Sequence, residues 1–406
     1  MHKFKLIAFF SLVMIACSNT TVDTSSSQMV QPIVHFDTLS PTEKLFYMRQ
    51  AEELYKNILL KNRAFSGGIL VAKNGDIVLE DYQGFIDFKN KIPITANTPI
   101  HIASTSKTFT SIVILRLMEQ GKLSLDQTVD SFFPLFPYKN ISIKDLLTHR
   151  SGLPNYTHFM DGPSVSVIKK RNKKGRIIKI FRLKNDSYVP TEKFVTNQSL
   201  LNFLITRKPA PNAMPNRAFQ YCNTNYALLA LIAEHVSGIS FPNYLRDSVF
   251  LPLGMKDSYV FSIQDTNHYI PSYQPNGALF GIQKLDCVYG DKNVYSTVRD
   301  LLKWDIALYQ AQIVSANTLN MAFAPYSNER RGEHNYGLGF RLLVRPTETI
   351  VYHNGWWHGN NAVFKRLIKD TATVIVLGNR FNKGIYAAGK ISSIFTGGID
   401  TTKTID

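Results

Sequence analysis

The feature that most constrains this chain is a long apolar segment at residues 101–120, which opens with a short polar motif. Apolar side chains surround nearly its whole circumference, namely Phe109, Ile112, Val113, Ile114, Leu115, Leu117 and Met118. A helix that is apolar on every side is normally buried in the core of a large protein. The segment therefore predicts a central, rigid helix, which is a good place to fix a reactive side chain.

Ser104 and Lys107 stand at the start of this segment and are spaced for nucleophilic chemistry. Residues three apart share one face of a helix, so the hydroxyl and the amine would be neighbours. A serine hydroxyl is a poor nucleophile near neutral pH, and a buried lysine can take its proton, directly or through a third group. Backbone amide groups at the start of the helix would add a positive electrostatic field at the place where negative charge develops in the reaction. The motif is weak alone, because Ser166 and Lys169 repeat it.

The composition is that of a globular protein, because 44% of the 406 residues are hydrophobic and 19% are charged. The N-terminus is different: Lys3 and Lys5 precede an apolar run that is too short to span a membrane comfortably. This run ends at Cys17, directly after a small residue, which resembles the lipobox of bacterial lipoproteins. We therefore expect a signal peptide over residues 1–16, lipid on Cys17 and a flexible tether over residues 17–39.

These features predict a lipoprotein of the bacterial cell envelope, either periplasmic or exposed at the cell surface. No other segment reaches membrane-spanning length, so the lipid would be the only contact with the membrane. Apart from Cys17, only Cys222 and Cys287 are present, which are too few for a disulfide framework and lack metal-ligand spacing. We predict no metal and no cofactor, and a bridge between the two cysteines stays open.

The net charge of +16 is concentrated in one place. Nine basic residues follow one another without an intervening acid, namely Lys169, Lys170, Arg171, Lys173, Lys174, Arg176, Lys179, Arg182 and Lys184. We expect a solvated insertion loop over about residues 163–188. Contact with anionic lipid or cell-wall polymer is the functional alternative, whereas nucleic acid is not an expected partner of a secreted lipoprotein.

Helix and strand signals lie at both ends of the globular part. Ser40 and Glu43 form a capping box around a proline, which predicts a helix from about residue 40 to residue 60. Strand-like runs at 68–72 and 76–82 flank a Lys-Asn-Gly hairpin signal. Further helices are predicted near residues 143–149, 197–206, 226–236, 297–309 and 385–395, and further strands over 336–344, 350–353, 361–368 and 373–377.

This order of elements predicts an α+β fold, in which a largely antiparallel sheet is flanked by terminal helices and carries an inserted all-α lobe. We place a single catalytic domain at residues 40–396. Its sheet lobe would comprise about residues 40–104 and 290–396, and its helical lobe about residues 105–289. Residues 397–406 would form a tail.

Two further motifs complete the candidate site. Tyr221 and Asn223 stand just before an apolar helix, so both side chains can point into one cleft. A tyrosine beside an ammonium group can act as general base, and Asn223 can bind both Lys107 and a substrate carbonyl. This pattern also occurs elsewhere in the chain, for example at Tyr55–Asn57 and Tyr138–Asn140, and is weak alone. His353 is more selective: it ends a predicted strand, and Gly355 would let a substrate backbone approach the sheet edge.

In this order, the motifs at Ser104–Lys107, Tyr221–Asn223 and His353–Gly355 resemble those of the serine penicillin-binding protein and class C β-lactamase-like family. The surrounding sequence matches as well, in GKLSLDQTVDSFFP, ISIKDLLTHRSGLPNY, YCNTNYALLALIAEHVSG, LGMKDSYVF, YSTVRDLLKWDIAL and HNGWWHGNNAVF. The resemblance extends from about Ser40 to Phe395 and implies the β-lactamase/DD-peptidase-like fold.

The resemblance also implies a mechanism. Ser104 would attack a carbonyl group and form an acyl-enzyme, Tyr221 with Lys107 would shuttle the proton, and water would release the acyl group. The backbone N–H groups of Ser104 and Trp356 would form the oxyanion hole, whose loss typically costs ~10²–10³ in rate. The other substrate-binding residues implied are Asn223, His353 and Gly355. Cys222 would point away from the cleft, and His149 and Arg150 are interpreted as loop-stabilising.

One difference from class C β-lactamases narrows the class of substrate that we expect. Class C β-lactamases carry lysine and threonine where this chain has His353 and Asn354, and histidine is charged only part of the time near neutral pH. Some D-alanyl-D-alanine peptidases, D-amino-acid peptidases and serine esterases of the family also have histidine. We therefore expect a serine hydrolase acting on a D-amino-acid peptide, such as one derived from peptidoglycan. A serine esterase or β-lactamase is the alternative within the fold, and a non-catalytic envelope-binding lipoprotein is the alternative outside it.

Overall fold

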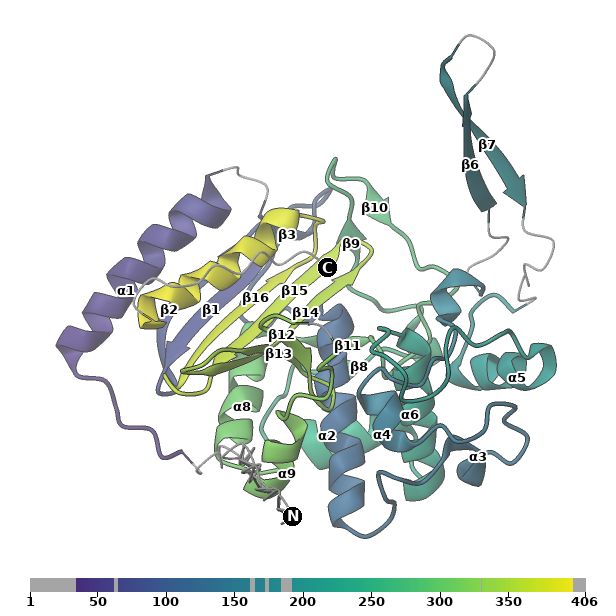
Figure 1. Cartoon of the computed structure of the whole chain (residues 1–406). Helices are drawn as coiled ribbons and strands as arrows, with labels where there is room; N and C mark the ends of the chain where they lie inside the picture. The colour runs from purple at the N-terminus through teal and green to yellow at the C-terminus, as the bar shows by residue number, and fades with distance from the viewer. Residues whose placement is uncertain are drawn as a thin grey trace, which may run out of the picture.

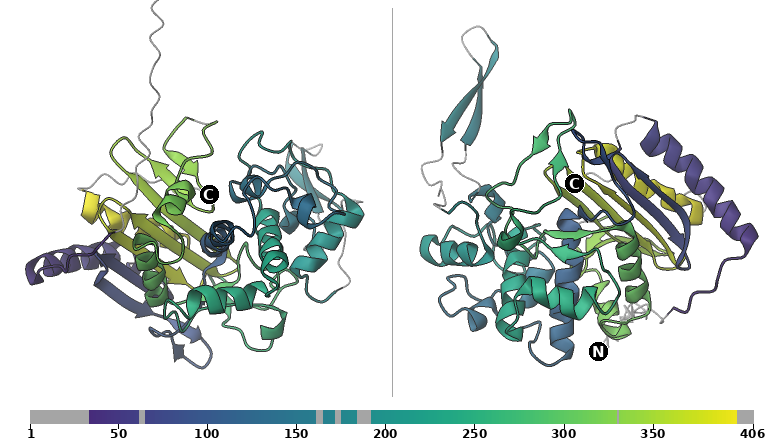
Figure 2. Two further views of the ribbon diagram at one scale, coloured as in Figure 1. Left: turned by 90° about the horizontal axis from the view of Figure 1, so that it is seen from below. Right: turned by 180° about the vertical axis from the view of Figure 1, so that it is seen from behind.

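The computed structural model describes residues 34–61, 65–160, 165–171, 175–183, 192–329 and 331–396 (Figure 1). The expected signal peptide, Cys17, most of the tether and the tail lie outside the described residues. In the described part of the chain, none of the helices has both the length and the apolarity that a membrane crossing requires. One large antiparallel sheet has helices on both faces, and a mainly helical region lies beside it (Figures 1 and 2).

The main sheet has the strand order β12-β13-β14-β15-β16-β1-β2, and all its neighbouring strands are antiparallel. Its strands are β1 (Gly67–Lys73), β2 (Asp76–Gln83), β12 (His334–Tyr336), β13 (Arg341–Val344), β14 (Thr349–Trp357), β15 (Asn360–Leu367) and β16 (Ala372–Gly378). Asn74 and Gly75 both have positive φ in the tight turn between β1 and β2. The predicted antiparallel sheet is confirmed, and it joins the two ends of the chain.

Among the described residues, six α-helices lie at or near their predicted positions, and three short ones, at residues 129–132, 241–245 and 316–322, were not predicted. They are α1 (Pro41–Tyr55), α2 (Ser106–Glu119), α3 (Val129–Phe132), α4 (Ile143–Leu147), α5 (Asn197–Arg207), α6 (Asn223–Ser237), α7 (Phe241–Leu245), α8 (Val298–Tyr309) and α9 (Ala316–Ala322). The predicted capping box of Ser40 and Glu43 opens α1. The predicted last helix is a 3₁₀ helix over Lys383–Ser392, in which Gly384 and Gly389 lower the α-helical propensity, and only its end, α10 (Ser393–Thr396), is α-helical.

The two faces of the sheet pack against different helices, because side chains alternate along each strand. On the outer face, Ile69 and Val71 pack with α1 and the C-terminal 3₁₀ helix. On the inner face, Leu70 and Ile375 join the main core, which also contains α2, α6 and α8. The inner face therefore supports the helix that carries the candidate nucleophile.

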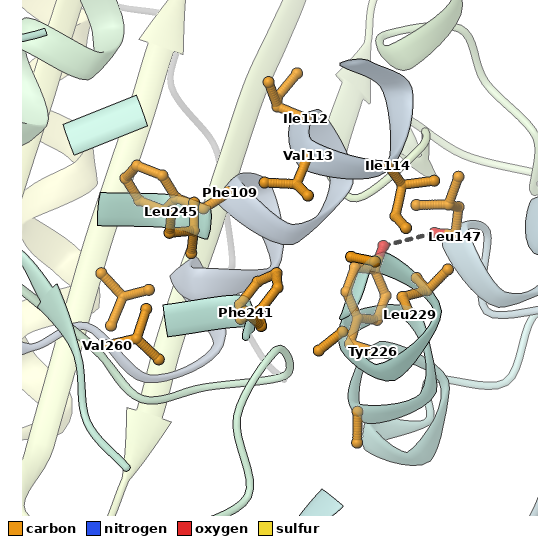
Figure 3. Close-up of a cluster of buried hydrophobic side chains, with 14 of the residues drawn as sticks. Phe109, Ile112, Val113, Ile114, Leu147, Tyr226, Leu229, Phe241, Leu245 and Val260 are labelled. Carbon is orange, nitrogen blue, oxygen red and sulfur yellow. Dashed lines mark hydrogen bonds between the residues drawn. The ribbon is translucent and has the colours of Figure 1, made fainter. Parts of the chain in front are cut away.

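Helix α2 is central and buried, as its apolar circumference predicts, and lies between the sheet and the helical region (Figure 2). Phe109 stacks on Trp304 of α8 with ring centroids 4.3 Å apart. On the other side α2 packs against α6 and α4, where the hydroxyl of Tyr226 donates a hydrogen bond to the Leu147 carbonyl at 2.7 Å (Figure 3). Packing on both sides fixes the axis of α2.

The basic segment differs from its prediction. An antiparallel hairpin of β6 (Val165–Arg171) and β7 (Ile177–Leu183) replaces the expected loop and projects away from the body of the molecule (Figures 1 and 2). Its register pairs Val167 with Phe181 and Lys169 with Lys179. β-Branched residues in both arms favour extended backbone, and this propensity outweighs the charge on which the prediction of a loop depended.

The predicted strand over residues 336–344 is wrong as a single element, because a turn divides it into β12 and β13. A Cβ atom at Gly337 would lie 2.1 Å from the Ala322 carbonyl oxygen, and Gly339 has φ +86. Both positions therefore require glycine. The turn places β13 beside the candidate active site.

Candidate active site

Ser104 lies in a 3₁₀ turn, η2 (Ala103–Thr105), that runs directly into α2. The residue before it, Ala103, has φ +49, a left-handed conformation that costs roughly 1–3 kcal/mol in a residue with a side chain. Its N–H group donates a hydrogen bond to Nδ1 of the buried His101 at 3.1 Å. This bond helps to hold the strained turn that presents Ser104.

The acceptor role of Nδ1 fixes the tautomer of His101. The ring proton must lie on Nε2, which donates to Oδ1 of Asn293 at 3.1 Å. Burial lowers the pKa of His101 to about 4, so the ring is neutral near neutral pH. A neutral histidine thus connects the Ser104 turn to the segment that precedes β11 (Val294–Ser296).

Lys107 reaches Ser104, as the spacing predicts. Its Nζ atom donates to Oγ of Ser104 at 3.1 Å and to the carbonyl oxygen of Asp291 at 2.7 Å. The side chain is completely buried. Nζ also lies 5.0 Å from the ring centroid of Tyr221 and 5.6 Å from that of Tyr226. The structure therefore brings the hydroxyl of Ser104 and the ring of Tyr221 together around one amine.

Tyr221 is positioned through His149, whose ring centroid lies 4.3 Å away. The N–H group of Cys222 donates to Nδ1 of His149 at 3.1 Å, and that of Gln220 donates to the His149 carbonyl at 2.8 Å. Both chain neighbours of Tyr221 are therefore held by one residue. Burial, reinforced by the charge of Lys107, lowers the pKa of His149 well below its usual range, so His149 is a neutral support. The loop-stabilising interpretation of His149 is confirmed.

Cys222 points into the protein interior, as expected, and its Sγ atom donates to the Leu153 carbonyl at 3.3 Å. Cys287 is also buried, and the two thiols are not bonded to each other. Burial raises the pKa of Cys222 to about 11, which disfavours the nucleophilic thiolate. The thiol next to Tyr221 therefore has a packing role.

Asn223 is the first residue of α6. The predicted bond between its side chain and Lys107 is not formed, since the amine donates to Ser104 and Asp291 instead. Oδ1 of Asn223 is buried and, among the described residues, has no hydrogen-bond partner. Such a group costs about 1–3 kcal/mol and is satisfied when a ligand supplies a donor.

His353 lies within β14, which continues to Trp357, rather than at the end of a strand as predicted. Its ring is completely buried: Nε2 accepts from the Tyr336 hydroxyl at 3.2 Å, and Nδ1 donates to the Asn354 carbonyl at 2.7 Å. Burial, reinforced by the charge of Arg341, lowers the pKa of His353 well below its usual range. The ring is therefore neutral, and both its nitrogens are bonded to the protein.

Gly355 is required by packing against the Ser104 turn. A Cβ atom there would lie 2.2 Å from the Ile102 carbonyl oxygen and 3.1 Å from the Ala103 side chain. Glycine thus lets β14 lie directly against the turn, a reason that the prediction of substrate approach did not include. The next residue, Trp356, has a side chain that is 64% exposed and donates from Nε1 to the His358 carbonyl at 3.0 Å.

Two residues at the site were not predicted from the sequence, because neither belongs to a recognisable motif. Arg341 on β13 places its guanidinium carbon 5.2 Å from the ring centroid of Tyr221. Asp291 contributes a backbone carbonyl, which no side-chain pattern reveals. Within the described residues, no group of three His, Cys, Asp or Glu side chains is placed to hold a metal ion.

Sequence comparisons find a family and relatives to which this chain is similar. Residues 49–390 match the model of the β-lactamase family. A penicillin-binding protein of Bacillus subtilis (strain 168) is 30% identical over 337 residues, which cover 78% of this chain and 68% of that protein. A D-aminopeptidase of Brucella anthropi is 24% identical over 313 residues, which cover 76% of this chain and 55% of that protein.

The fold is also similar to solved structures. The octameric penicillin-binding protein homologue from Pyrococcus abyssi is 26% identical and superposes with a TM-score of 0.69, over 86% of this chain and 77% of that chain. The similarity therefore includes both the sheet and the helical region.

Proposed function

The chain belongs to the family of β-lactamases and serine penicillin-binding proteins, and from this we propose that it hydrolyses an amide or ester through an acyl-enzyme on Ser104. The observation that carries the proposal is the 3.1 Å hydrogen bond from Lys107 to the Ser104 hydroxyl. The amine that makes this bond is completely buried and lies against the ring of Tyr221. A protein that only binds a ligand does not need a serine hydroxyl held in this way.

In the proposed reaction, Oγ of Ser104 attacks the substrate carbonyl carbon while its proton passes to the pair formed by Lys107 and Tyr221. The backbone N–H groups of Ser104 and Trp356 would stabilise the negative charge that develops on the carbonyl oxygen. The same proton is returned to the leaving amine or alcohol as its bond to carbon breaks. Water then attacks the acyl-enzyme, the acid product leaves, and the Ser104 hydroxyl is restored.

The substrate class that we propose is a D-amino-acid peptide with a free carboxylate. Oδ1 of Asn223 is a buried acceptor that a substrate N–H group would satisfy. Arg341 supplies a permanent positive charge beside Tyr221, whereas His353 is neutral. The similarity to a D-aminopeptidase supports this class, and an ester or a β-lactam is the alternative substrate.

We also propose that the protein acts in the bacterial cell envelope, anchored by lipid on Cys17. The apolar run and the cysteine that follows it support this location, as does the similarity to a penicillin-binding protein. Expression with a labelled fatty acid would test it, because Cys17→Ala should abolish incorporation of the label. Incorporation that persists in this variant would rule out lipidation at Cys17.

The central test is covalent labelling with a fluorescent penicillin and with a fluorophosphonate, in the wild type and in Ser104→Ala. The proposal requires labelling of the wild type alone. Labelling of the alanine variant would rule out Ser104 as the nucleophile, and a wild type that hydrolyses nothing and is not labelled would favour a non-catalytic binding protein.

The substrate class is tested with a D-Ala-D-Ala peptide, a p-nitrophenyl ester and nitrocefin. We expect the highest kcat/KM for the peptide. Arg341→Met should raise KM for the peptide and leave that for the uncharged ester unchanged, because only the peptide carries a carboxylate. Equal effects on both substrates would show that Arg341 does not bind the carboxylate.

A further inference from the structure

A second buried lysine, Lys292, lies behind the site, and its neighbour Asp291 is the residue that binds Lys107. We propose that the ion pair of Asp291 and Lys292 positions Lys107 and sets the pH above which the site can take the proton of Ser104. This inference depends on the proposed function, since it concerns the proton acceptor of that reaction. Both residues are positioning residues, because they would act on Ser104 only through Lys107.

Each residue of the pair is held by hydrogen bonds to other groups, whereas the two charges meet as an ion pair in which Oδ1 of Asp291 has no hydrogen-bond partner among the described residues. Nζ of Lys292 donates to the Tyr156 hydroxyl at 2.5 Å and to the Val288 carbonyl at 2.9 Å, and it lies 3.6 Å from Oδ1 of Asp291. The Tyr156 hydroxyl in turn donates to Oδ2 of Asp291 at 2.9 Å. The ring of Trp357, on the strand of the proposed oxyanion hole, lies 4.7 Å from the ammonium nitrogen. The exposed fractions of the Lys292 and Asp291 side chains are 3% and 1%.

Asp291 joins this pair to the nucleophile. Its carboxylate is held by Tyr156 and Lys292, while its carbonyl oxygen accepts the 2.7 Å hydrogen bond from Lys107. The carbonyl belongs to the same residue as the carboxylate, so fixing the side chain also fixes the backbone atom that directs Nζ of Lys107 toward Ser104. If Asp291 had no charged partner, its side chain would be held less firmly, and its backbone carbonyl would be free to shift.

The pair also matters electrostatically, because buried charges act over longer distances than exposed ones. Burial lowers the pKa of Lys292, and the negative charges of Asp291 and Asp286 raise it, whereas the positive charge of Lys107 lowers it. Lys107 and Lys292 therefore repel each other. The Asp291 carboxylate attracts both and offsets part of this repulsion.

Other titratable groups surround the two lysines, namely Tyr156, Tyr221, Tyr226, His149, Cys222, Asp286, Arg341 and His353. Burial keeps His149 and His353 neutral and raises the pKa of Tyr156 and Tyr226 well above the usual range. Asp286 is engaged by Trp357 and His358 at 2.7 and 2.9 Å. Asp291 and Lys292 are thus the two opposite charges next to Lys107 that can be removed without replacing Ser104, Lys107 or Tyr221.

Removal of one charge at a time predicts shifts of opposite sign. In Lys292→Met, the uncompensated carboxylate of Asp291 favours the protonated form of the Lys107–Tyr221 pair. The acid limb, which is the low-pH part of the curve of Ser104 acylation rate against pH, should therefore move to higher pH. In Asp291→Asn, the uncompensated ammonium of Lys292 disfavours that form, so the acid limb should move to lower pH. Each shift should be on the order of one pH unit, which is a tenfold change in rate at a fixed pH on the limb.

The experiment measures the rate of Ser104 acylation by a fluorophosphonate between pH 5 and pH 10 in the full-length wild type, in both single variants and in the double variant. The double variant, which has neither charge, should have an acid limb close to that of the wild type. Limbs that stay in place, or that move in the same direction in both single variants, overturn the inference. A wild type that is not labelled at Ser104 overturns the proposed function as well.

A matched control separates electrostatics from loss of stability. Arg366 and Asp305 form another buried ion pair, between β15 and α8. The double variant Arg366→Met with Asp305→Asn should leave the acid limb unchanged. A control that moves the limb as far as Lys292→Met does would also overturn the inference, because the shift would then reflect general loosening of the fold.

Discussion

Acid should destabilise this protein at a pH where its carboxylates are still ionised, because neutral buried histidines must take up protons when the chain unfolds. His101, His149 and His353 are completely or almost completely buried. The pKa of His101 falls from 6.5 to about 4 on folding, and burial also lowers those of His149 and His353 well below 6.5. The unfolded chain therefore binds more protons than the folded one below pH 6.5, and stability falls as the pH falls.

The magnitude follows from the width of this pH window. Each pH unit between 6.5 and 4 costs about 1.4 kcal/mol per histidine, so His101 alone would cost about 3 kcal/mol across the window. His149 and His353 add costs of the same sign, because burial lowers their pKa values as well. Domains are typically stable by ~5–15 kcal/mol, so the cost at His101 alone would be a substantial part of the stability.

The assay is urea unfolding at several pH values between 5 and 7.5, where the slope of the unfolding free energy against pH gives the proton uptake. We expect a net uptake of protons on unfolding near pH 5.5, to which all three histidines contribute. In His101→Asn, the amide oxygen can replace Nδ1 as acceptor from Ala103, and the uptake should fall by one. The matched control, His268→Asn, changes an exposed side chain and should not alter it. An uptake that is the same in wild type and His101→Asn would refute the reasoning.

Three further changes test the site. Lys107→Met should lower the rate of Ser104 acylation by about 10²–10⁴, as expected for loss of a proton acceptor, and a smaller loss in stopped-flow labelling would contradict that role. Gly355→Ala should displace the Ser104 turn, because its Cβ would lie 2.2 Å from the Ile102 carbonyl oxygen; we expect a cost of about 1–3 kcal/mol in thermal unfolding and a lower kcat. Deletion of residues 169–184 should leave kcat/KM for a soluble ester unchanged, since the hairpin projects from the body; a large loss would show that it shapes the site.

The parts of the fold that could be predicted are those in which one short stretch determines its own structure. The capping box at Ser40 defines the start of α1, and the Asn74–Gly75 turn aligns β1 with β2. The unbroken apolar surface of α2 predicts its burial, and the spacing of Ser104 and Lys107 predicts their contact. In each case the physical cause lies within a few residues of its effect.

The predictions failed where the cause is distant in the sequence. Gly355 faces the carbonyl of Ile102, so the reason for that glycine could not be found in the motif that contains it. The bond predicted between Asn223 and Lys107 is replaced by one to the Asp291 carbonyl, and a backbone acceptor has no sequence signature. The basic hairpin is predicted as a loop when its charge is given more weight than the β-branched residues that occur in both arms.

Class C β-lactamases carry a lysine where this chain has His353 in β14. In this chain the neighbouring strand, β13, supplies a positive charge through Arg341. A lysine at position 353 would have to be buried where the neutral ring of His353 lies, between the Tyr336 hydroxyl and the Asn354 carbonyl. Arg341 is paired with Tyr352, the residue before His353, and its guanidinium lies against Tyr221. The permanent positive charge at this side of the site therefore belongs to β13 and not to β14. In the proposed reaction, a substrate carboxylate attracted to Arg341 would therefore lie beside Tyr221, which is why Arg341→Met should act on the peptide and not on the ester.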